Sequence, residues 1–133
     1  MPVYVETATA PSTQDAADLV KIYADAPEWL FAPYVDAADL LTQAQRQKTL
    51  VVGRFNSRLL GAGILSKTDD AWYLSHLCVR ELTRKRGVAR RILEEAQRLA
   101  NENQVKLILV IPNHHKELLH WAQAKSFAVQ LTD

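Results

Sequence analysis

The chain has 133 residues, 48% of them hydrophobic, which is enough for one compact core and too few for two ordinary domains. Its 16 Lys and Arg against 15 Asp and Glu leave a net charge of +1, which argues against the broad basic face of a non-specific nucleic-acid binder. No stretch approaches the roughly 18 apolar residues that span a membrane, and a lone cysteine, Cys78, excludes an internal disulfide. We therefore expect one domain, residues 1–133, in a soluble cytoplasmic protein.

The first third of the chain predicts one strand, Val3–Thr7, and two helices. Ser12 or Thr13 is placed to cap the first helix. The apolar residues that recur on one face of that helix are Ala16, Leu19, Val20 and Tyr23. The aromatic segment 27–34 begins with a proline that ends this helix, and we expect its rings to plug the core rather than form a binding platform. Asp36 is placed to cap the second helix, whose buried side carries Ala37, Leu40, Leu41 and Ala44.

The middle of the chain predicts three antiparallel strands. Thr49–Phe55 and Arg58–Leu65 are rich in β-formers, and the two residues between them, Asn56 and Ser57, favour a tight hairpin turn. The polar residues 67–70 then turn the chain into a third strand, Ala71–Val79. These three strands should form a meander.

The last third predicts a helix, a strand, a helix and a strand. Val88–Ala100 is amphipathic, and its expected buried side chains are Val88, Ile92, Leu93, Ala96 and Leu99. Val105–Ile111 is a continuous apolar run, as in a strand covered on both faces, and should pair in parallel with Ala71–Val79 across the helix. Pro112 and Asn113 open the last helix, and Phe127–Leu131 predicts the final strand.

The run Arg84-Lys85-Arg86-Gly87-Val88-Ala89 stands where an apolar strand leads into an amphipathic helix. The N-terminus of a helix offers unpaired N–H groups and the positive end of the peptide dipole, so it binds phosphate oxygens well. Gly87 lets the backbone approach a ligand closely, and Arg84, Arg86 and Arg90 can add charge-assisted hydrogen bonds. The alternative to a phosphate site is that this run is an ordinary solvent-exposed start of a helix.

This motif and the element order resemble the GNAT superfamily of acetyl-CoA-dependent N-acetyltransferases, whose signature Arg84, Gly87 and Ala89 match. The resemblance implies an α/β fold with a single central mixed sheet, an antiparallel meander plus a parallel, splayed strand pair, flanked by helices on both faces. It also implies an acetyl-CoA or CoA site. The backbone of Leu77, Cys78 and Val79 would pair with the pantetheine arm, and Asn113 would lie near it. The diphosphate would bind at Thr83, Arg84, Lys85, Arg86, Gly87, Val88, Ala89 and Arg90.

The sequence offers few candidates for the general acid and the general base that a transferase needs. An acetyl acceptor amine must lose a proton before it attacks a thioester, and the nearest candidates for that catalytic role are His76 and Ser75. Ala122 stands where the family usually places a proton-donating tyrosine, and Ser126 replaces the following glycine. For Cys78, a small strand residue is favoured over a catalytic thiol. Whether the chain is an enzyme is therefore left open.

A narrower resemblance is to the bacterial PanZ/PanM-type maturation factors. It covers the first two-thirds of the chain, through the stretches 11–22, 54–60 and 79–95, and is loose after about residue 103. It implies an acetyl-CoA-loaded regulator that binds the pro-form of aspartate decarboxylase and promotes its self-cleavage, in pantothenate and CoA biosynthesis. The alternative is an active N-acetyltransferase acting on a primary amine of a small molecule or a protein. No nucleic-acid or membrane partner is expected.

Two other groups of side chains have weaker signals. Arg54, Arg58 and the stretch 80–85 are candidates for partner contacts, or ordinary surface charge. The histidines at 114, 115 and 120 lack the spacing and the carboxylate of a zinc site, so we expect no metal.

Overall fold

The computed structural model describes residues 3–8, 11–24, 26–80 and 87–132. The elements before the signature are β1 (Tyr4–Thr7), α1 (Thr13–Ala24), the 3-10 helix η1 (Glu28–Leu30), α2 (Ala37–Gln47), β2 (Leu50–Phe55), β3 (Arg58–Lys67) and β4 (Ala71–Val79). Those after it are α3 (Val88–Glu102), β5 (Lys106–Pro112), α4 (Lys116–Ala124) and β6 (Ala128–Thr132). The predicted order of strands and α-helices is confirmed, and η1 is the addition. None of the described helices has both the length and the apolar character to cross a membrane.

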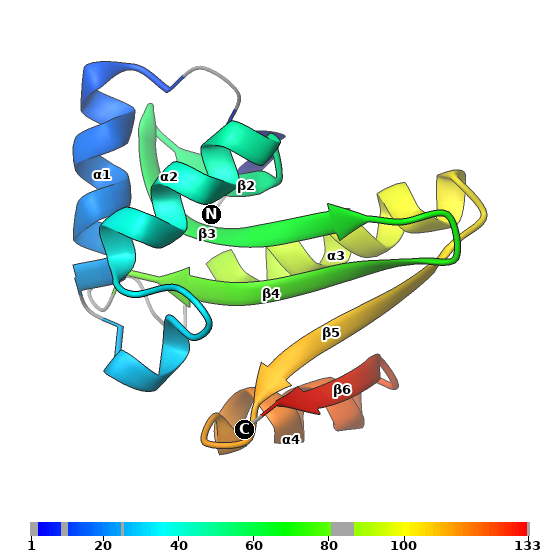
Figure 1. Ribbon diagram of the computed structural model, residues 1–133. Coiled ribbons are helices and arrows are strands. Elements are labelled where there is room, and N and C mark those ends of the chain that lie inside the picture. The colour runs from blue at the N-terminus through cyan, green and yellow to red at the C-terminus, as the bar shows by residue number, and fades with distance from the viewer. Residues whose placement is uncertain (1–2, 9–10, 25, 81–86, 133) are drawn as a thin grey trace.

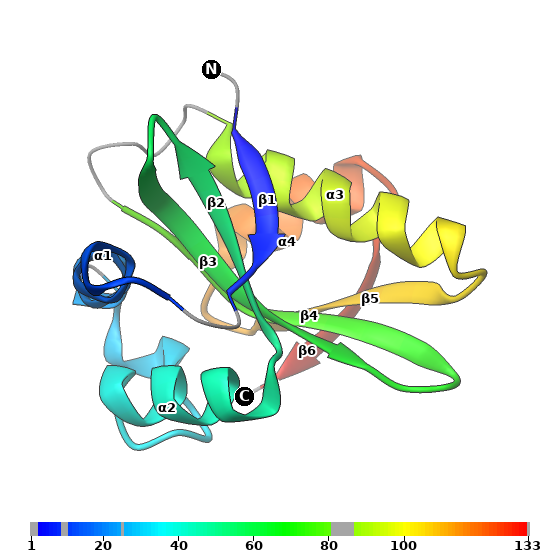
Figure 2. The same ribbon diagram turned by 90° about the horizontal axis from the view of Figure 1, so that it is seen from above.

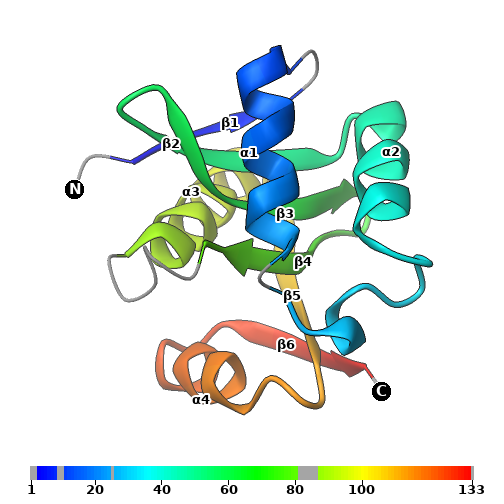
Figure 3. The same cartoon turned by 90° about the vertical axis from the view of Figure 1, so that its left-hand side faces the viewer.

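The strands form one mixed sheet in the order β1-β2-β3-β4-β5-β6 (Figure 1). The strands from β1 to β4 pair in antiparallel fashion, whereas β5 is parallel to both β4 and β6. The predicted meander and parallel pair are therefore confirmed. Helices lie on both faces, with α3 on one side and α1 and α2 on the other (Figures 2 and 3).

Each face of the sheet has its own hydrophobic core. On one face, α3 and α4 cover a cluster that includes Leu74, Ile92 and Leu109. On the other, α1 and α2 pack on β2, β3 and β4 over a cluster that includes Leu19 and Leu40. Because α1 and α2 do not extend over β5, its alternate residues are only partly buried there. The expectation that β5 is fully covered on both faces was wrong.

The buried face of α1 differs from the prediction. Ala16 and Val20 are exposed, and Asp18 and Ile22 are wholly buried in their place. Asp18 accepts hydrogen bonds from the Arg58 guanidinium, at 2.6 Å to Nη2, and from the backbone N–H of Leu59 at 3.1 Å. A carboxylate that is paired and hydrogen-bonded can be buried. Helical periodicity alone assigns Asp18 to the solvent and therefore predicts the wrong buried face for α1.

Local signals fixed two of the predicted boundaries well. Asp36 caps α2 by accepting from the backbone N–H of Asp39 at 2.9 Å. Asn56 and Ser57 both have positive φ, 49° and 67°, as a tight hairpin between twisted strands requires. The last helix begins later than predicted, because residues 113–115 form a turn before Lys116.

Candidate functional site

The parallel strands β4 and β5 separate halfway along the sheet. Their register runs from Ala71 opposite Lys106 to Leu74 opposite Leu109, and ends there. Beyond it β5 stays paired with β6 through Pro112, while β4 turns away with the meander (Figure 1). The predicted splay is present, and it opens a gap between two strands of one sheet.

A bulge bends β4 where the splay begins. Ala62 and Ile64 of β3 stand opposite Cys78 and Ser75, so β4 has one more residue than its partner over this stretch. The extra length is taken up at His76, whose φ is +54°. The bulge directs the following segment, Leu77 to Val79, toward the gap.

A cavity of about 510 Å³ lies beside the splayed end of β4, between β4, α3, α4 and the segment around η1. The described residues that line it are Pro27, Trp29, Leu30, Leu77, Cys78, Val79, Gly87, Val88, Ala89, Arg90, Leu93, His115, Glu117, Leu118 and Trp121. Its lining is mostly apolar, with a few polar side chains such as Arg90, His115 and Glu117, as small-molecule sites usually are.

The N-terminus of α3 forms one wall of this cavity. Gly87 has φ +83°, a left-handed conformation that glycine adopts without strain, and it precedes a first turn with no acidic residue. Val88 is buried against Gly61 of β3, where an added Cβ would lie 2.8 Å from Val88 Cγ1. This close approach sets the helix end against the sheet, so its first-turn amides and Arg90 stand at the cavity.

The structure brings most of the predicted coenzyme residues together. The described members of the set that line the cavity are Leu77, Cys78, Val79, Gly87, Val88, Ala89 and Arg90. Thr83, Arg84, Lys85 and Arg86 lie outside the described residues. Asn113 is exposed in the turn before α4, where its backbone N–H donates to the Thr132 carbonyl at 2.7 Å, and it is not among the lining residues.

The two candidate catalytic residues are hydrogen-bonded to each other. His76 Nδ1 lies 2.8 Å from Ser75 Oγ, and His76 Nε2 lies 2.8 Å from the carbonyl oxygen of Ala32. Because that carbonyl can only accept, Nε2 carries the proton and the Nδ1 lone pair faces the Ser75 hydroxyl. Burial lowers the pKa of His76, and the bond to Ala32 partly offsets this by raising it. The lone pair that a base needs is thus occupied.

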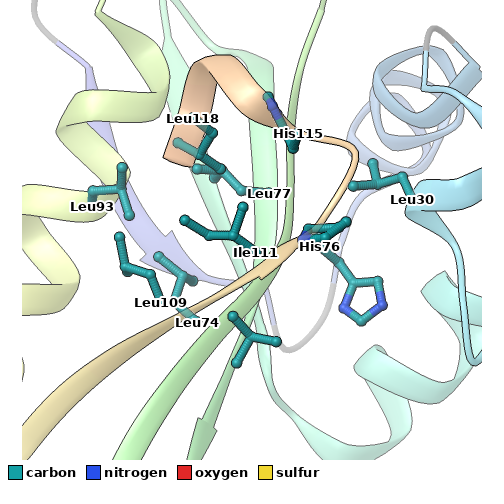
Figure 4. Close-up of a pocket in the computed structure, with 11 residues that line it drawn as sticks. Leu30, Leu74, His76, Leu77, Leu93, Leu109, Ile111, His115 and Leu118 are labelled. Atoms are coloured by element: carbon teal, nitrogen blue, oxygen red, sulfur yellow. The ribbon is translucent and has the colours of Figure 1, made fainter. Parts of the chain in front are cut away.

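A second, much smaller cavity of about 10 Å³ lies at the inner end of the splay. It shares Leu30, Leu77, Leu93, His115 and Leu118 with the larger one. Its other walls come from Leu74, His76 and the β5 residues Leu109 to Pro112. Figure 4 shows leucine side chains converging there from several elements, while the His76 ring points away from them.

The position that the GNAT resemblance assigns to a proton-donating tyrosine is occupied by an alanine. Ala122 is fully buried, and no tyrosine occurs among the described residues that line the cavity. Tyr23 is buried on the far face of β4, where its hydroxyl donates to the His76 carbonyl at 2.8 Å and burial raises its pKa. The thiol of Cys78 is also buried and donates to the Ile22 carbonyl at 3.3 Å, as a packed strand residue does.

The other predicted groups have structural contacts. Arg54 binds Asp15 at 2.9 Å and Glu6 at 2.7 Å, and Arg58 binds Asp18, so both arginines tie the β2–β3 hairpin to α1 or β1. His114 and His115 pack against Trp29. Among the described residues, no three His, Cys, Asp or Glu side chains gather as a metal site would need.

Sequence reasoning missed the walls that the η1 segment and α4 contribute. Trp29 was expected as a core plug, and Leu118 and Trp121 lie in the predicted last helix, to which no part in the site was assigned. All three are only partly buried, because they line the cavity. The one available signal was the pair of apolar residues at Leu118 and Trp121, at i and i+3, on the helix that follows the splayed strand.

Residues 2–131 match the family described as "Acetyltransferase (GNAT) domain, PanZ". The chain belongs to the PanZ family of GNAT domains. A PanD regulatory factor from Salmonella typhimurium is 37% identical to it over 87 residues, which make up 65% of this chain and 60% of that relative. The match thus spans less than two thirds of the relative's length.

Solved structures with this fold include coenzyme complexes. A PaiA N-acetyltransferase from Thermoplasma acidophilum in complex with coenzyme A superposes with a TM-score of 0.69 at 13% identity, over 100% of this chain and 94% of that chain. A GNAT family acetyltransferase from Elizabethkingia anophelis with acetyl-CoA bound gives a TM-score of 0.63 at 18% identity, over 93% and 73% of the two chains. At these identities the similarity shows the GNAT fold, as the sequence predicted.

Proposed function

We propose that this protein is an acetyl-CoA-binding regulator that promotes the maturation of aspartate 1-decarboxylase. The observation that carries the proposal is the 510 Å³ cavity between the splayed end of β4 and the N-terminus of α3, in a chain of the PanZ family that lacks a free base and a proton donor at the expected positions. The name of the Salmonella relative, a PanD regulatory factor, supports a decarboxylase as the partner.

The residues present fit an acyl-CoA. The first-turn amides of α3 and the Arg90 guanidinium offer donors and positive charge for a diphosphate. Arg84 and Arg86 would add to that charge. The edge of β4 from Leu77 to Val79 lies along the cavity where an extended amide chain such as pantetheine fits as an added strand. Asn113 is proposed to approach the same arm.

Two observations favour regulation over acetyl transfer. The His76 lone pair is engaged by Ser75, and Ala122 stands in place of the proton donor. A regulator needs neither an acid nor a base, because a ligand that orders one surface raises the affinity of a partner that recognises that surface. The bound acetyl-CoA would then act as the signal rather than as a substrate.

The test is the cleavage of the purified decarboxylase pro-form from the same cell, with and without this protein and with and without acetyl-CoA. We expect faster cleavage when both are present than when either is omitted. An unchanged rate under every condition would refute the regulatory function.

A second candidate is an N-acetyltransferase in which His76, or a water held by Ser75, acts as base. The observation that favours it is that His76 lines the smaller cavity at the inner end of the splay. Release of free thiol from acetyl-CoA should then rise with a suitable amine and fall in His76→Ala. If no amine or N-terminal peptide in a broad panel raises thiol release above hydrolysis, this candidate fails.

A further inference from the structure

Three aromatic rings join the η1 segment to the turn before α4. Trp29 stacks on His114, with ring centroids 5.5 Å apart and planes 21° apart. His115 meets the same indole edge-on, at 5.7 Å and 69°. Both separations lie within the roughly 4.5–7 Å range of favourable aromatic pairs. The chain positions joined in this way are far apart in sequence, so the contact is a tertiary one.

The same segment is also joined to β4. The Ala32 carbonyl accepts from His76 Nε2 at 2.8 Å, and Tyr34 packs edge-on against the His76 ring with centroids 5.2 Å apart. Residues 27–34, which we name the strap, are therefore tied to one splayed strand through His76 and to the end of the other through Trp29. Figures 1 and 3 show this light-blue segment close to the end of β5.

The strap forms one wall of the large cavity through Pro27, Trp29 and Leu30. Leu30 and His115, the ring partner of Trp29, also line the smaller cavity between β4 and β5, whereas Gly87 to Arg90 line only the large one. Leu30 and His115 therefore extend this wall toward the gap between the strands. Given the proposed function, on which this step rests, a coenzyme whose diphosphate lies at α3 has its thioester beside Trp29 and His115.

We propose that the strap retains the bound acyl-CoA by closing the thioester end of the cavity, with Trp29 as the residue that holds it shut. The two anchors of the strap would have to separate before an acceptor amine reached the thioester from that side. A transferase must admit an acceptor and release its product at every turnover, whereas a sensor gains from a long-lived complex. The strap would therefore keep acetyl-CoA bound in a chain that lacks a free base and a proton donor.

The experiment measures the dissociation rate of acetyl-CoA by stopped-flow displacement with excess unlabelled coenzyme. We expect Trp29→Ala to raise this rate roughly tenfold or more, with a smaller change in the association rate. The neighbouring Glu28→Ala, exposed on the same turn, is the matched control and should leave both rates unchanged. His114→Ala, which removes an exposed ring that stacks on Trp29, should raise the dissociation rate in the same direction and tests the strap even if Trp29→Ala folds poorly.

Adenosine 3′,5′-bisphosphate separates the two ends of the site, because it carries the nucleotide part of the coenzyme without the pantetheine arm. Its affinity should be the same in the wild type and in Trp29→Ala, since this probe lacks the arm whose thioester the strap would enclose. Acetyl-CoA dissociation that is unchanged in both Trp29→Ala and His114→Ala would overturn the strap and leave the proposed function standing. A wild-type chain that binds no acetyl-CoA would overturn both.

Discussion

At Gly87, the effect of backbone conformation on ligand binding can be separated from the effect of an added charge. The residue has φ +83°, and among the described residues the nearest atom to an added Cβ is Arg90 Nη2, 3.5 Å away. Asparagine tolerates left-handed φ better than most residues, and aspartate has nearly the same shape with a negative charge. A pair of variants at this position therefore probes the anion site itself.

We predict that Gly87→Asp lowers the affinity for CoA by roughly 100-fold or more, because it places a carboxylate where the diphosphate would approach. Gly87→Asn should keep most of the affinity, since it adds similar bulk without the charge. Isothermal titration calorimetry measures both, and circular dichroism checks that each variant folds. Equal affinities in the two variants would contradict a diphosphate at this helix end.

Asp18 is the charged residue on which the packing of α1 depends most. The Arg58 hydrogen bonds lower its pKa from 3.8 to about 2, assisted by the Leu59 N–H and the Gln14 amide and opposed by burial. A carboxyl with a lowered folded-state pKa stabilises the fold at pH values above its unfolded pKa. That contribution is lost as the pH falls from about 4 toward about 2.

Asp18→Asn should therefore lower the free energy of unfolding at pH 7 by about 2 kcal/mol, since the pair is half-exposed on its Arg58 side and partly screened. The difference from the wild type should shrink between pH 4 and pH 2, as the wild-type carboxyl takes up its proton. Urea unfolding at several pH values measures this. Asp70→Asn, in an exposed turn, is the control and should change stability little. If the stability difference between the wild type and Asp18→Asn does not change with pH, the lowered pKa of Asp18 is contradicted.

The residues predicted well from sequence are those whose signals are local. Asn56 and Ser57 form the expected turn, Asp36 caps α2, and Gly87 precedes α3. Asp18 was missed because its partner, Arg58, lies on another element, and periodicity alone assigns charged residues to the solvent. Trp29 was expected in the core for a similar reason, since its partly buried position depends on the turn before α4, which is distant in sequence.

At the scale of elements, the site depends on how closely α3 approaches the sheet. Gly61 of β3 lies under both walls: an added Cβ would be 2.8 Å from Val88 Cγ1 and 3.2 Å from Val79 Cγ2. The first is closer than side chains tolerate, so a substitution must displace the buried Val88 side chain or the start of α3 that carries it. The cavity between the two walls should change with it.

We predict that Gly61→Ala destabilises the protein by about 1 to 3 kcal/mol through overpacking and weakens CoA binding several-fold. Shortening the opposing side chain should relieve the clash, so the double variant Gly61→Ala with Val88→Ala should be more stable than the sum of the two single changes. Thermal unfolding and calorimetry of the four proteins form a mutant cycle. Strict additivity would mean that the helix start does not rest on Gly61.

Other elements show why topology was predictable and the cavity was not. The order of strands and helices follows from the pattern along the chain, and parallel pairing of β4 with β5 follows from the helix between them. The depth of the splay depends instead on the β4 bulge at His76 and on β6, which holds the far half of β5. Both are consequences of pairing that sequence periodicity does not encode.

At the scale of the whole molecule, the features divide into a well-formed binding cavity and a poorly formed catalytic centre. The cavity joins residues from both halves of the chain, from Pro27 to Trp121. The catalytic candidates His76 and Ser75 are hydrogen-bonded to each other, and Ala122 cannot act as an acid. This division favours the proposed acetyl-CoA-binding regulator over the alternative N-acetyltransferase.

Native mass spectrometry of this protein mixed with the aspartate decarboxylase pro-form is the most direct measurement of that role. With acetyl-CoA present, we predict a complex whose mass includes both proteins and one acetyl-CoA for each copy of this chain. Omitting the coenzyme, or using Gly87→Asp, should remove most of the complex, whereas Gly87→Asn should retain it. The same amount of complex with and without acetyl-CoA, or none in either case, would contradict an acetyl-CoA-dependent regulator.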